Sequence, residues 1–196
     1  MNLPNKITVS RLFMAPLFFI IYFLPQWTGA DQTLMTWLLI IVYVLIEASD
    51  LLDGIIARKY HMVTDLGKVL DPFSDVLSRM TYFVCLAFSS IMPLWVFLII
   101  LYRELGVTFL RMILMGQGIA MAASIWGKFK AVLYAVSAIL GILYSVLIRM
   151  VEGTPVWLDL YGTILPYIFI LAALASVLSF VSYLVSAIPK LSRMTR

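Results

Sequence analysis

Six long apolar runs dominate this chain and restrict what it can fold into. A helix that crosses a bilayer needs about 20 mainly apolar residues, whereas a closed barrel would show shorter, alternating segments. Of the 196 residues, 63% are hydrophobic and 12% are charged, although a soluble domain has about a quarter of its residues charged. The sequence therefore predicts one all-α integral membrane domain over residues 1–196. The six predicted transmembrane helices are Val9–Leu24, Leu34–Ala57, Leu70–Ile91, Leu94–Met115, Ala131–Met150 and Tyr161–Ala187.

Basic residues gather at one set of helix ends, which predicts the orientation of the chain. Lysine and arginine are enriched in cytoplasmic loops. With six spans, one side of the membrane carries Lys6, Arg11, Arg58 and Lys128, and the other side carries Asp31 and Glu152. Both termini are thus predicted to be cytoplasmic, with residues 1–11 forming a short interfacial helix before the first span. The net charge of +4 follows from this asymmetry and does not point to nucleic acid as a partner.

Four aspartates lie at or inside the second and third predicted helices. A charged side chain in hydrocarbon is costly, so it is found where it faces a polar cavity, a metal or a partner. Positions three or four apart share a helix face, so Asp50 lies beside Asp53, and Asp71 lies beside Asp75. The segment between the two helices is short, which favours antiparallel neighbours with facing carboxylates. Hard oxygen ligands suit magnesium or manganese, and two such ions bridged by carboxylates serve phosphoryl chemistry.

Small and basic residues accompany the aspartates on the same faces. Gly54 and Ala57 leave room for a base or a phosphate to approach, and Arg58 supplies a guanidinium fork for phosphate. Gly67 and Arg79 extend the acidic stripe of the third helix. Two other interpretations stay open: purely structural ion pairs with nearby basic residues, and a divalent-cation transporter, because intramembrane acids often mark ion pathways. The clustering of the acids on one side and the lack of an inverted repeat favour an enzyme.

The spacing of these residues also resembles a known signature. From Asp50 the chain reads DLLDGIIARKYHMVTDLGKVLDPFSD, which has every fixed position of the CDP-alcohol phosphotransferase pattern. The segments NLPNKITVSR, RELGVTFLR (Arg103–Arg111) and GKFKA (Gly127–Ala131) are similar to the bacterial phosphatidylglycerophosphate synthases of that family. The resemblance implies a membrane enzyme that transfers a phosphatidyl group from CDP-diacylglycerol to glycerol 3-phosphate and releases CMP.

The resemblance also implies a role for each motif residue. Asp50, Asp53 and Asp71 would bind two Mg²⁺ or Mn²⁺ ions, with Asp75 completing the second metal site and acting as general base. The nucleotide would be bound by Gly54, Ala57, Arg58, Asn5 and Thr8. Gly67 and Arg79 would be auxiliary. Homodimers in the cytoplasmic membrane of a bacterium, with the active site facing the cytoplasm, are expected from the family alone.

The acceptor is inferred from basic residues elsewhere in the chain. A phosphorylated acceptor needs a cationic pocket, and the candidates for it are Arg103, Arg111, Lys128 and Lys130. Arg103 sits beside Glu104, so those two are expected to pair. The related synthases commonly have Lys after the last aspartate, where this chain has Val76, and Arg79 lies one turn beyond Asp75 to supply that charge. Inositol phosphate, serine, choline and phosphatidylglycerol stay open as alternative acceptors.

Overall fold

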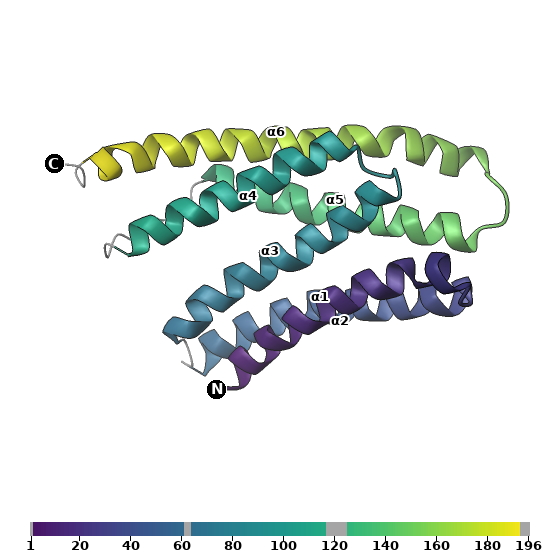
Figure 1. The fold of residues 1–196 in the computed structure, drawn as a ribbon, viewed down its shortest axis with the longest axis horizontal. Coiled ribbons are helices and arrows are strands. Elements are labelled where there is room, and N and C mark those ends of the chain that lie inside the picture. The colour runs from purple at the N-terminus through teal and green to yellow at the C-terminus, as the bar shows by residue number, and fades with distance from the viewer. Residues whose placement is uncertain (1, 61–63, 117–124, 193–196) are drawn as a thin grey trace. The chain divides into compact units, whose positions relative to one another are not determined.

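The computed structural model of the protein describes residues 2–60, 64–116 and 125–192, except for the side chains of 57, 58, 65, 66, 68, 115 and 189–192. The described residues form six α-helices and no strand (Figure 1), so the prediction of an all-helical chain is confirmed. The helices are α1 Leu3–Thr28, α2 Gln32–Lys59, α3 Asp65–Phe88, α4 Leu94–Met115, α5 Ile125–Met150 and α6 Val156–Ser192.

The helix bounds follow the apolar runs and local capping. The fourth helix has the predicted bounds, whereas α3 begins and ends earlier than its apolar run suggests. Thr64 caps the start of α3, because its Oγ1 accepts a hydrogen bond from the Gly67 amide at 3.0 Å. At the other end, Ser90 has a left-handed backbone (φ 59°), and the amide of Ile91 turns back to the carbonyl of Leu86 at 2.9 Å. Because α3 begins and ends at these two caps, Asp71 and Asp75 both lie within this helix.

The expected short interfacial helix does not exist as a separate element. Residues 3–28 form one continuous helix, α1, and Pro16 lies within it without ending it. The physical reason is the direction of the polar side chains at its start. Asn5, Thr8 and Arg11 are buried against other polar groups of the protein, so this segment packs inward and does not need an interface to solvate it.

The chain forms two compact units. Unit 1 comprises Met1–Cys85 and Ser145–Thr154. Within it α1 packs along α2 (Figure 1). Its core is aromatic: the rings of Phe18 and Tyr43 each meet the ring of Tyr82, with centroids 4.9 and 5.0 Å apart, in the edge-on arrangement that aromatic pairs favour. The Arg149 guanidinium lies 4.2 Å from the centre of the Tyr22 ring, which joins the end of α5 to α1.

Unit 2 comprises Leu86–Tyr144 and Pro155–Arg196. In this unit α4 packs against α6, around a buried cluster of Val107, Leu114, Tyr183 and Ala187. Helix α5 approaches its neighbours closely at Gly141. A Cβ atom there would lie 2.4 Å from Leu86 Cδ1 and 2.9 Å from Phe169 Cζ. Small residues let helices approach in this way inside membranes.

Replacing Gly141 by Ala is therefore expected to destabilise unit 2. Leu86 and Phe169 are fully buried, so the added methyl overpacks the core at a cost of about 1–3 kcal/mol. Alanine has a better helix propensity than glycine, which offsets about 1 kcal/mol of this cost. The measurement is the thermal unfolding midpoint in detergent. Gly116→Ala is the control, because a Cβ at Gly116 meets its nearest atoms at an ordinary 3.5 Å, and an equal midpoint for both variants would contradict the close approach.

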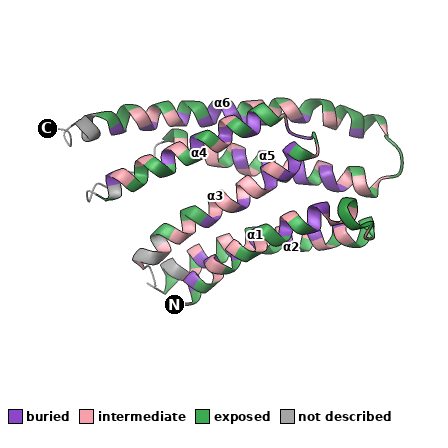
Figure 2. Cartoon of the chain, in the orientation of Figure 1, coloured by how far each residue is buried: buried purple, intermediate pink, exposed green. Residues whose placement is uncertain are grey.

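Exposed residues occur along all the described helices (Figure 2), and many of them are large and apolar. Large side chains such as Phe13, Phe88, Ile125 and Val156 are more than two thirds exposed, which in water would be an extended apolar patch. Among the described residues, three helices are long and apolar enough to span a membrane: α1, α5 and residues Val156–Ile188 of α6. The protein is thus a membrane protein. The charged residues discussed below lie mainly in the other three helices.

Candidate active site

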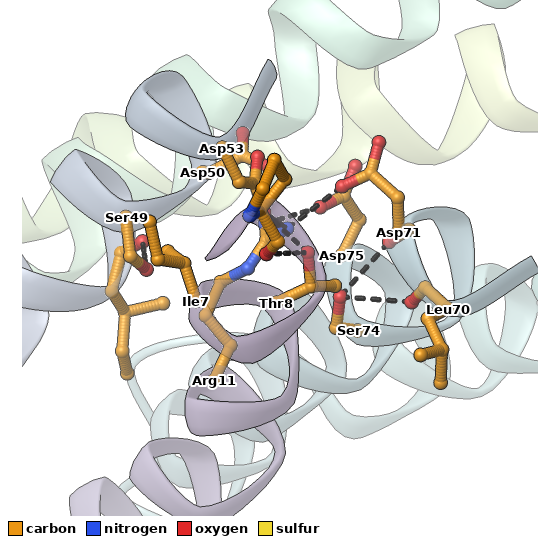
Figure 3. A network of polar contacts seen from close by, with 12 residues as sticks. Ile7, Thr8, Arg11, Ser49, Asp50, Asp53, Leu70, Asp71, Ser74 and Asp75 are labelled. Atoms are coloured by element: carbon orange, nitrogen blue, oxygen red, sulfur yellow. Dashed lines mark hydrogen bonds and ion pairs between the residues drawn. The ribbon is translucent and has the colours of Figure 1, made fainter. Parts of the chain in front are cut away.

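The four motif aspartates lie on two helices of unit 1 (Figure 3). Asp50 and Asp53 are one turn apart on α2, and Asp71 and Asp75 are one turn apart on α3. One carboxylate oxygen from each of Asp50, Asp53 and Asp71 lies within 4.8 Å of the other two. The convergence expected from the helical spacing is therefore present.

Arg11 of α1 contacts all four aspartates. Its Nη1 atom pairs with Asp50 and, at 2.7 Å, with Asp75. Its Nη2 atom pairs with Asp53 at 2.6 Å and with Asp71 at 2.7 Å. In Figure 3 the guanidinium points into the space between the two helices where the carboxylates meet. A planar guanidinium with five donors is the side chain best suited to hold several carboxylates at once.

Sequence reasoning missed this role of Arg11 and counted it only as a charge at the start of a helix. A signal was present, because Asn5, Thr8 and Arg11 follow one another at intervals of three and so share a helix face. All three lie in the segment NLPNKITVSR, which resembles related synthases, and Arg11 is its last residue. A polar stripe that enters an apolar run is costly unless it has partners, and the acidic stripes of α2 and α3 are those partners.

Thr8 and Asn5 extend the polar contacts of α1. The Thr8 hydroxyl donates to Asp53 Oδ2 at 2.7 Å, and the Asn5 amide donates to Thr64 Oγ1 at 2.9 Å. Gly67 is needed at this point, because a Cβ there would lie 2.8 Å from Asn5 Oδ1. The structure thus brings Asn5, Thr8 and Gly67 to the start of α3 and to Asp53, as a predicted site would require.

A small polar pocket adjoins the aspartates on the side of Glu47. It has room for about one water molecule, and it is lined by Arg11, Ile46, Glu47, Asp50, Asp75, Ser78 and Arg79. Arg79 therefore does share a pocket with Asp75, as its position one turn further along α3 predicts. The buried Ser78 hydroxyl has no hydrogen-bond partner among the described residues.

Three predicted nucleotide residues follow Asp53 on α2. Gly54 is partly exposed, which is compatible with a close approach by a ligand. The side chains of Ala57 and Arg58 lie outside the described residues, so their roles stay predictions.

The four predicted acceptor residues belong to unit 2. Arg103 and Lys130 both pair with Glu104 Oε1, at 2.8 and 2.6 Å, which confirms the expected contact between Arg103 and Glu104. Arg103 also donates to Ser179 Oγ at 2.7 Å. The side chains of Arg103 and Glu104 are nearly inaccessible, and that of Lys130 is 12% exposed.

The other two acceptor candidates are exposed. Arg111 lies 5.8 Å from the centre of the Tyr183 ring, and Lys128 is in the first turn of α5. The four residues therefore form one buried ion cluster and two exposed cations.

The aspartate cluster fits a divalent metal by its chemistry. It supplies only carboxylate oxygens, which hard cations such as Mg²⁺ and Mn²⁺ prefer. Asp50, Asp71 and Asp75 are each about a third to a half exposed, while Asp53 is 4% exposed. An ion can therefore reach the cluster from solvent, and Asp53 anchors it on the protein side.

Comparison with known proteins agrees with the motif. The family model described as CDP-alcohol phosphatidyltransferase matches residues 1–165. A CDP-diacylglycerol–glycerol-3-phosphate 3-phosphatidyltransferase of Treponema pallidum (strain Nichols) is 30% identical over 98% of this chain and 92% of its own length. The protein of that name from Bacillus subtilis (strain 168) is 38% identical over 71% of this chain and 76% of its own length.

One relative carries a different name. A CMP-forming cardiolipin synthase of Streptomyces coelicolor is 35% identical over 53% of this chain and 47% of its own length. The family model covers most of the chain, and the relative from Treponema pallidum spans nearly all of it. The chain therefore belongs to the CDP-alcohol phosphatidyltransferase family.

Proposed function

We propose that this protein transfers a phosphatidyl group from CDP-diacylglycerol to glycerol 3-phosphate, giving phosphatidylglycerophosphate and CMP. The observation that carries the proposal is the convergence of the four motif aspartates on one point in unit 1. The names of the relatives from Treponema pallidum and Bacillus subtilis support the choice of acceptor.

The metal is assigned to Asp50, Asp53, Asp71 and Asp75, which would hold two Mg²⁺ or Mn²⁺ ions. When bound, divalent metal neutralises the donor pyrophosphate and helps CMP to leave. The three ligand oxygens within 4.8 Å of one another support this assignment. Gly54, Ala57 and Arg58, with Asn5 and Thr8, would bind the cytidine nucleotide.

Asp75 is the proposed general base. It would accept the proton of the acceptor hydroxyl while that oxygen attacks the phosphorus that bears diacylglycerol. The phosphoanhydride bond from this phosphorus to the CMP oxygen then breaks, so a phosphoester replaces a phosphoanhydride and CMP leaves with the bonding electrons. Asp75 is partly exposed beside a polar pocket, which supports access by an acceptor hydroxyl. A base must come within hydrogen-bond reach of the proton that it removes.

The acceptor phosphate is assigned to Arg103, Arg111, Lys128 and Lys130. Glu104 neutralises only one of the two buried cations that contact it, so this cluster keeps an excess positive charge. An excess of buried positive charge favours an anionic ligand over serine or choline. The exposed Arg111 and Lys128 would add to the attraction.

Membrane placement belongs to the same proposal. The six apolar runs would each form a span, and the distribution of basic residues favours cytoplasmic termini and a site facing the cytoplasm. A bacterial cell membrane is proposed from the family alone. A homodimer is proposed from the family alone, and cross-linking in native membranes would test it.

The test of the proposed function is release of CMP from CDP-diacylglycerol by the purified protein in detergent. Glycerol 3-phosphate, inositol phosphate, serine, choline and phosphatidylglycerol would be supplied one at a time, with Mg²⁺ or Mn²⁺ or with a chelator. We expect metal-dependent release with glycerol 3-phosphate. Release only with phosphatidylglycerol would change the acceptor from glycerol 3-phosphate to phosphatidylglycerol. No release with any acceptor, together with Mn²⁺ flux in liposomes, would instead support a cation transporter.

Replacing Thr8 by Val is expected to weaken metal binding and activity by about 10- to 100-fold, the usual effect of losing a hydrogen bond to a metal ligand. The substitution keeps the shape of the side chain but removes the hydroxyl that donates to Asp53. The measurements are the Mn²⁺ dissociation constant and the rate of CMP release. Ser10→Ala on the same helix is the control, because the Ser10 hydroxyl donates to the nearby Ile7 carbonyl and to no other described residue. A Thr8→Val protein with wild-type Mn²⁺ affinity would remove Thr8 from the site.

Replacing Lys128 by Met is expected to raise the KM for glycerol 3-phosphate about tenfold, because a charge-assisted contact to phosphate is worth roughly 1.5–3 kcal/mol. The KM for CDP-diacylglycerol should stay the same. Steady-state CMP release with each substrate varied in turn measures both. Lys6→Met removes an equal charge from an exposed position on α1 and is the control. Equal increases in both variants would indicate a general electrostatic effect.

A further inference from the structure

Arg11 and a divalent metal would need the same oxygen atoms. The guanidinium contacts Oδ1 of Asp50, Asp71 and Asp75 and Oδ2 of Asp53. Asp50, Asp53 and Asp71 also form the set whose ligand atoms lie close enough together to hold an ion. A guanidinium in the centre of this set and a metal ion bound by it are both cations, so their simultaneous presence is opposed by contact and by charge.

Arg11 is held mainly by its ion pairs with the four aspartates. Only 1% of its side chain is exposed, and its Nε atom is buried without a hydrogen-bond partner among the described residues. The four aspartates are thus its main anchors. Asp71, in contrast, is 49% exposed, so an ion can reach its carboxylate from solvent.

A destination for the displaced guanidinium lies next to the cluster. Arg11 itself lines the polar pocket that also contains Glu47, Ser78 and Arg79. Glu47 is one turn before Asp50 on α2, and it supplies a carboxylate that is not among the motif aspartates. The buried Ser78 hydroxyl, unpartnered in the described part of the chain, adds an acceptor. Arg79 lines the same pocket, so two guanidinium groups would share Glu47.

We propose that Arg11 exchanges between the four-aspartate cluster and the Glu47 pocket as divalent metal binds and leaves. This inference rests on the metal site of the proposed function. Arg11 is then a positioning residue. It keeps four repelling carboxylates together until metal arrives, and it sets the apparent metal affinity. When a competent state is only a fraction of the population, apparent affinity falls by that fraction.

The test is Mn²⁺ binding to the purified full chain in detergent, followed by the electron paramagnetic resonance of free Mn²⁺, without donor or acceptor. Arg11→Met is expected to tighten binding at least tenfold, because an arginine that occupies the cluster nine-tenths of the time weakens it by that factor. Lys6→Met is the matched control: it removes the same charge from an exposed position on the same helix, and a change under about threefold is expected at physiological salt.

The Glu47 pocket is tested by a double-mutant cycle. Glu47→Gln is expected to weaken Mn²⁺ binding about three- to tenfold in the wild-type background, because the displaced Arg11 loses its counter-charge. In the Arg11→Met background the same change should have less than a twofold effect. An equal effect of Glu47→Gln in both backgrounds would overturn the exchange, as would an Arg11→Met protein that binds Mn²⁺ no more tightly than the Lys6→Met control.

Two further variants keep the test decisive. Arg11→Lys retains a positive charge but lacks the fork that reaches four carboxylates. It should therefore fold even if the Arg11→Met protein does not. Its Mn²⁺ affinity should lie between those of wild type and Arg11→Met. An Mn²⁺ affinity of Arg11→Lys equal to that of wild type would count against the proposal.

Asp71→Asn tests whether Mn²⁺ binds at the aspartate cluster. If it binds Mn²⁺ like wild type, the metal site of the proposed function fails, whereas unchanged affinity in the Arg11 variants alone leaves that site intact and overturns only the exchange.

Discussion

Replacing Asp75 by Asn is expected to reduce CMP release at least about 100-fold, and up to about 10,000-fold, the range that a positioned general base contributes. Asn keeps the size of the side chain and can still contact Arg11, but its amide cannot accept a proton from the acceptor hydroxyl. Release of CMP with saturating CDP-diacylglycerol, glycerol 3-phosphate and Mn²⁺ measures the effect.

Ser74→Ala is the control for this experiment. Ser74 precedes Asp75 on α3, is buried, and donates only to carbonyls of its own helix, so near wild-type activity is expected. The Mn²⁺ affinity of the Asp75→Asn protein shows whether Asp75 acts as a general base alone or also as a metal ligand. Unchanged affinity with lost activity indicates a base, and weaker affinity indicates that Asp75 is also a metal ligand. Activity above about a tenth of wild type would mean that another group accepts the proton.

Replacing Glu104 by Ala is expected to be the most destabilising change in unit 2. Its Oε1 atom accepts from both Arg103 and Lys130, and all three side chains are largely buried. Removing it leaves two buried cations uncompensated, which costs about 3–5 kcal/mol. For a chain of this size the unfolding midpoint should fall by roughly 6–20 °C. Thermal unfolding in detergent, followed by circular dichroism, measures it.

The controls for Glu104 separate charge from shape. Glu104→Gln keeps an acceptor oxygen and should lose less stability than Glu104→Ala. Glu152→Ala removes an exposed carboxylate from the loop after α5, where a change within about 0.5 kcal/mol is usual. A Glu104→Ala midpoint within a degree or two of the Glu152→Ala midpoint would show that the buried cluster contributes little to stability.

The buried ion clusters of the two units differ in the sign of their excess charge. In unit 1 four carboxylates surround one guanidinium, and in unit 2 two cations share one carboxylate. Buried charge that is left unmatched is costly, so it is retained where a ligand completes it. The first cluster supplies the carboxylate oxygens that hard divalent cations prefer, and the second carries an excess of positive charge.

The helices and the acidic motif were predictable from the sequence because each depends on local spacing. An apolar run of about 20 residues specifies a helix without reference to the rest of the chain. Intervals of three and four residues put Asp50 beside Asp53 and Asp71 beside Asp75 whatever packs against them. The contact of Arg103 with Glu104 was also predictable, since the two are adjacent in sequence.

The contacts between helices depended on the tertiary structure. The same charge pattern that predicts cytoplasmic ends gave Arg11 only a topological role. The polar stripe of α1 indicates that Arg11 needs a partner, but it does not identify carboxylates 39 to 64 residues away. The continuous α1 has the same cause, since its polar first turns are compensated only by residues of α2 and α3.

The sequence by itself thus determined that this is a helical membrane protein of the CDP-alcohol phosphatidyltransferase family with an acidic site. Only the tertiary structure decided that Arg11 stands among the aspartates, that Glu47 and Arg79 line the adjoining pocket, and that Lys130 shares Glu104 with Arg103. Helical periodicity specifies a face of one helix. Which other helix packs against that face depends on contacts between helices, and the spacing of residues along one helix does not determine these contacts.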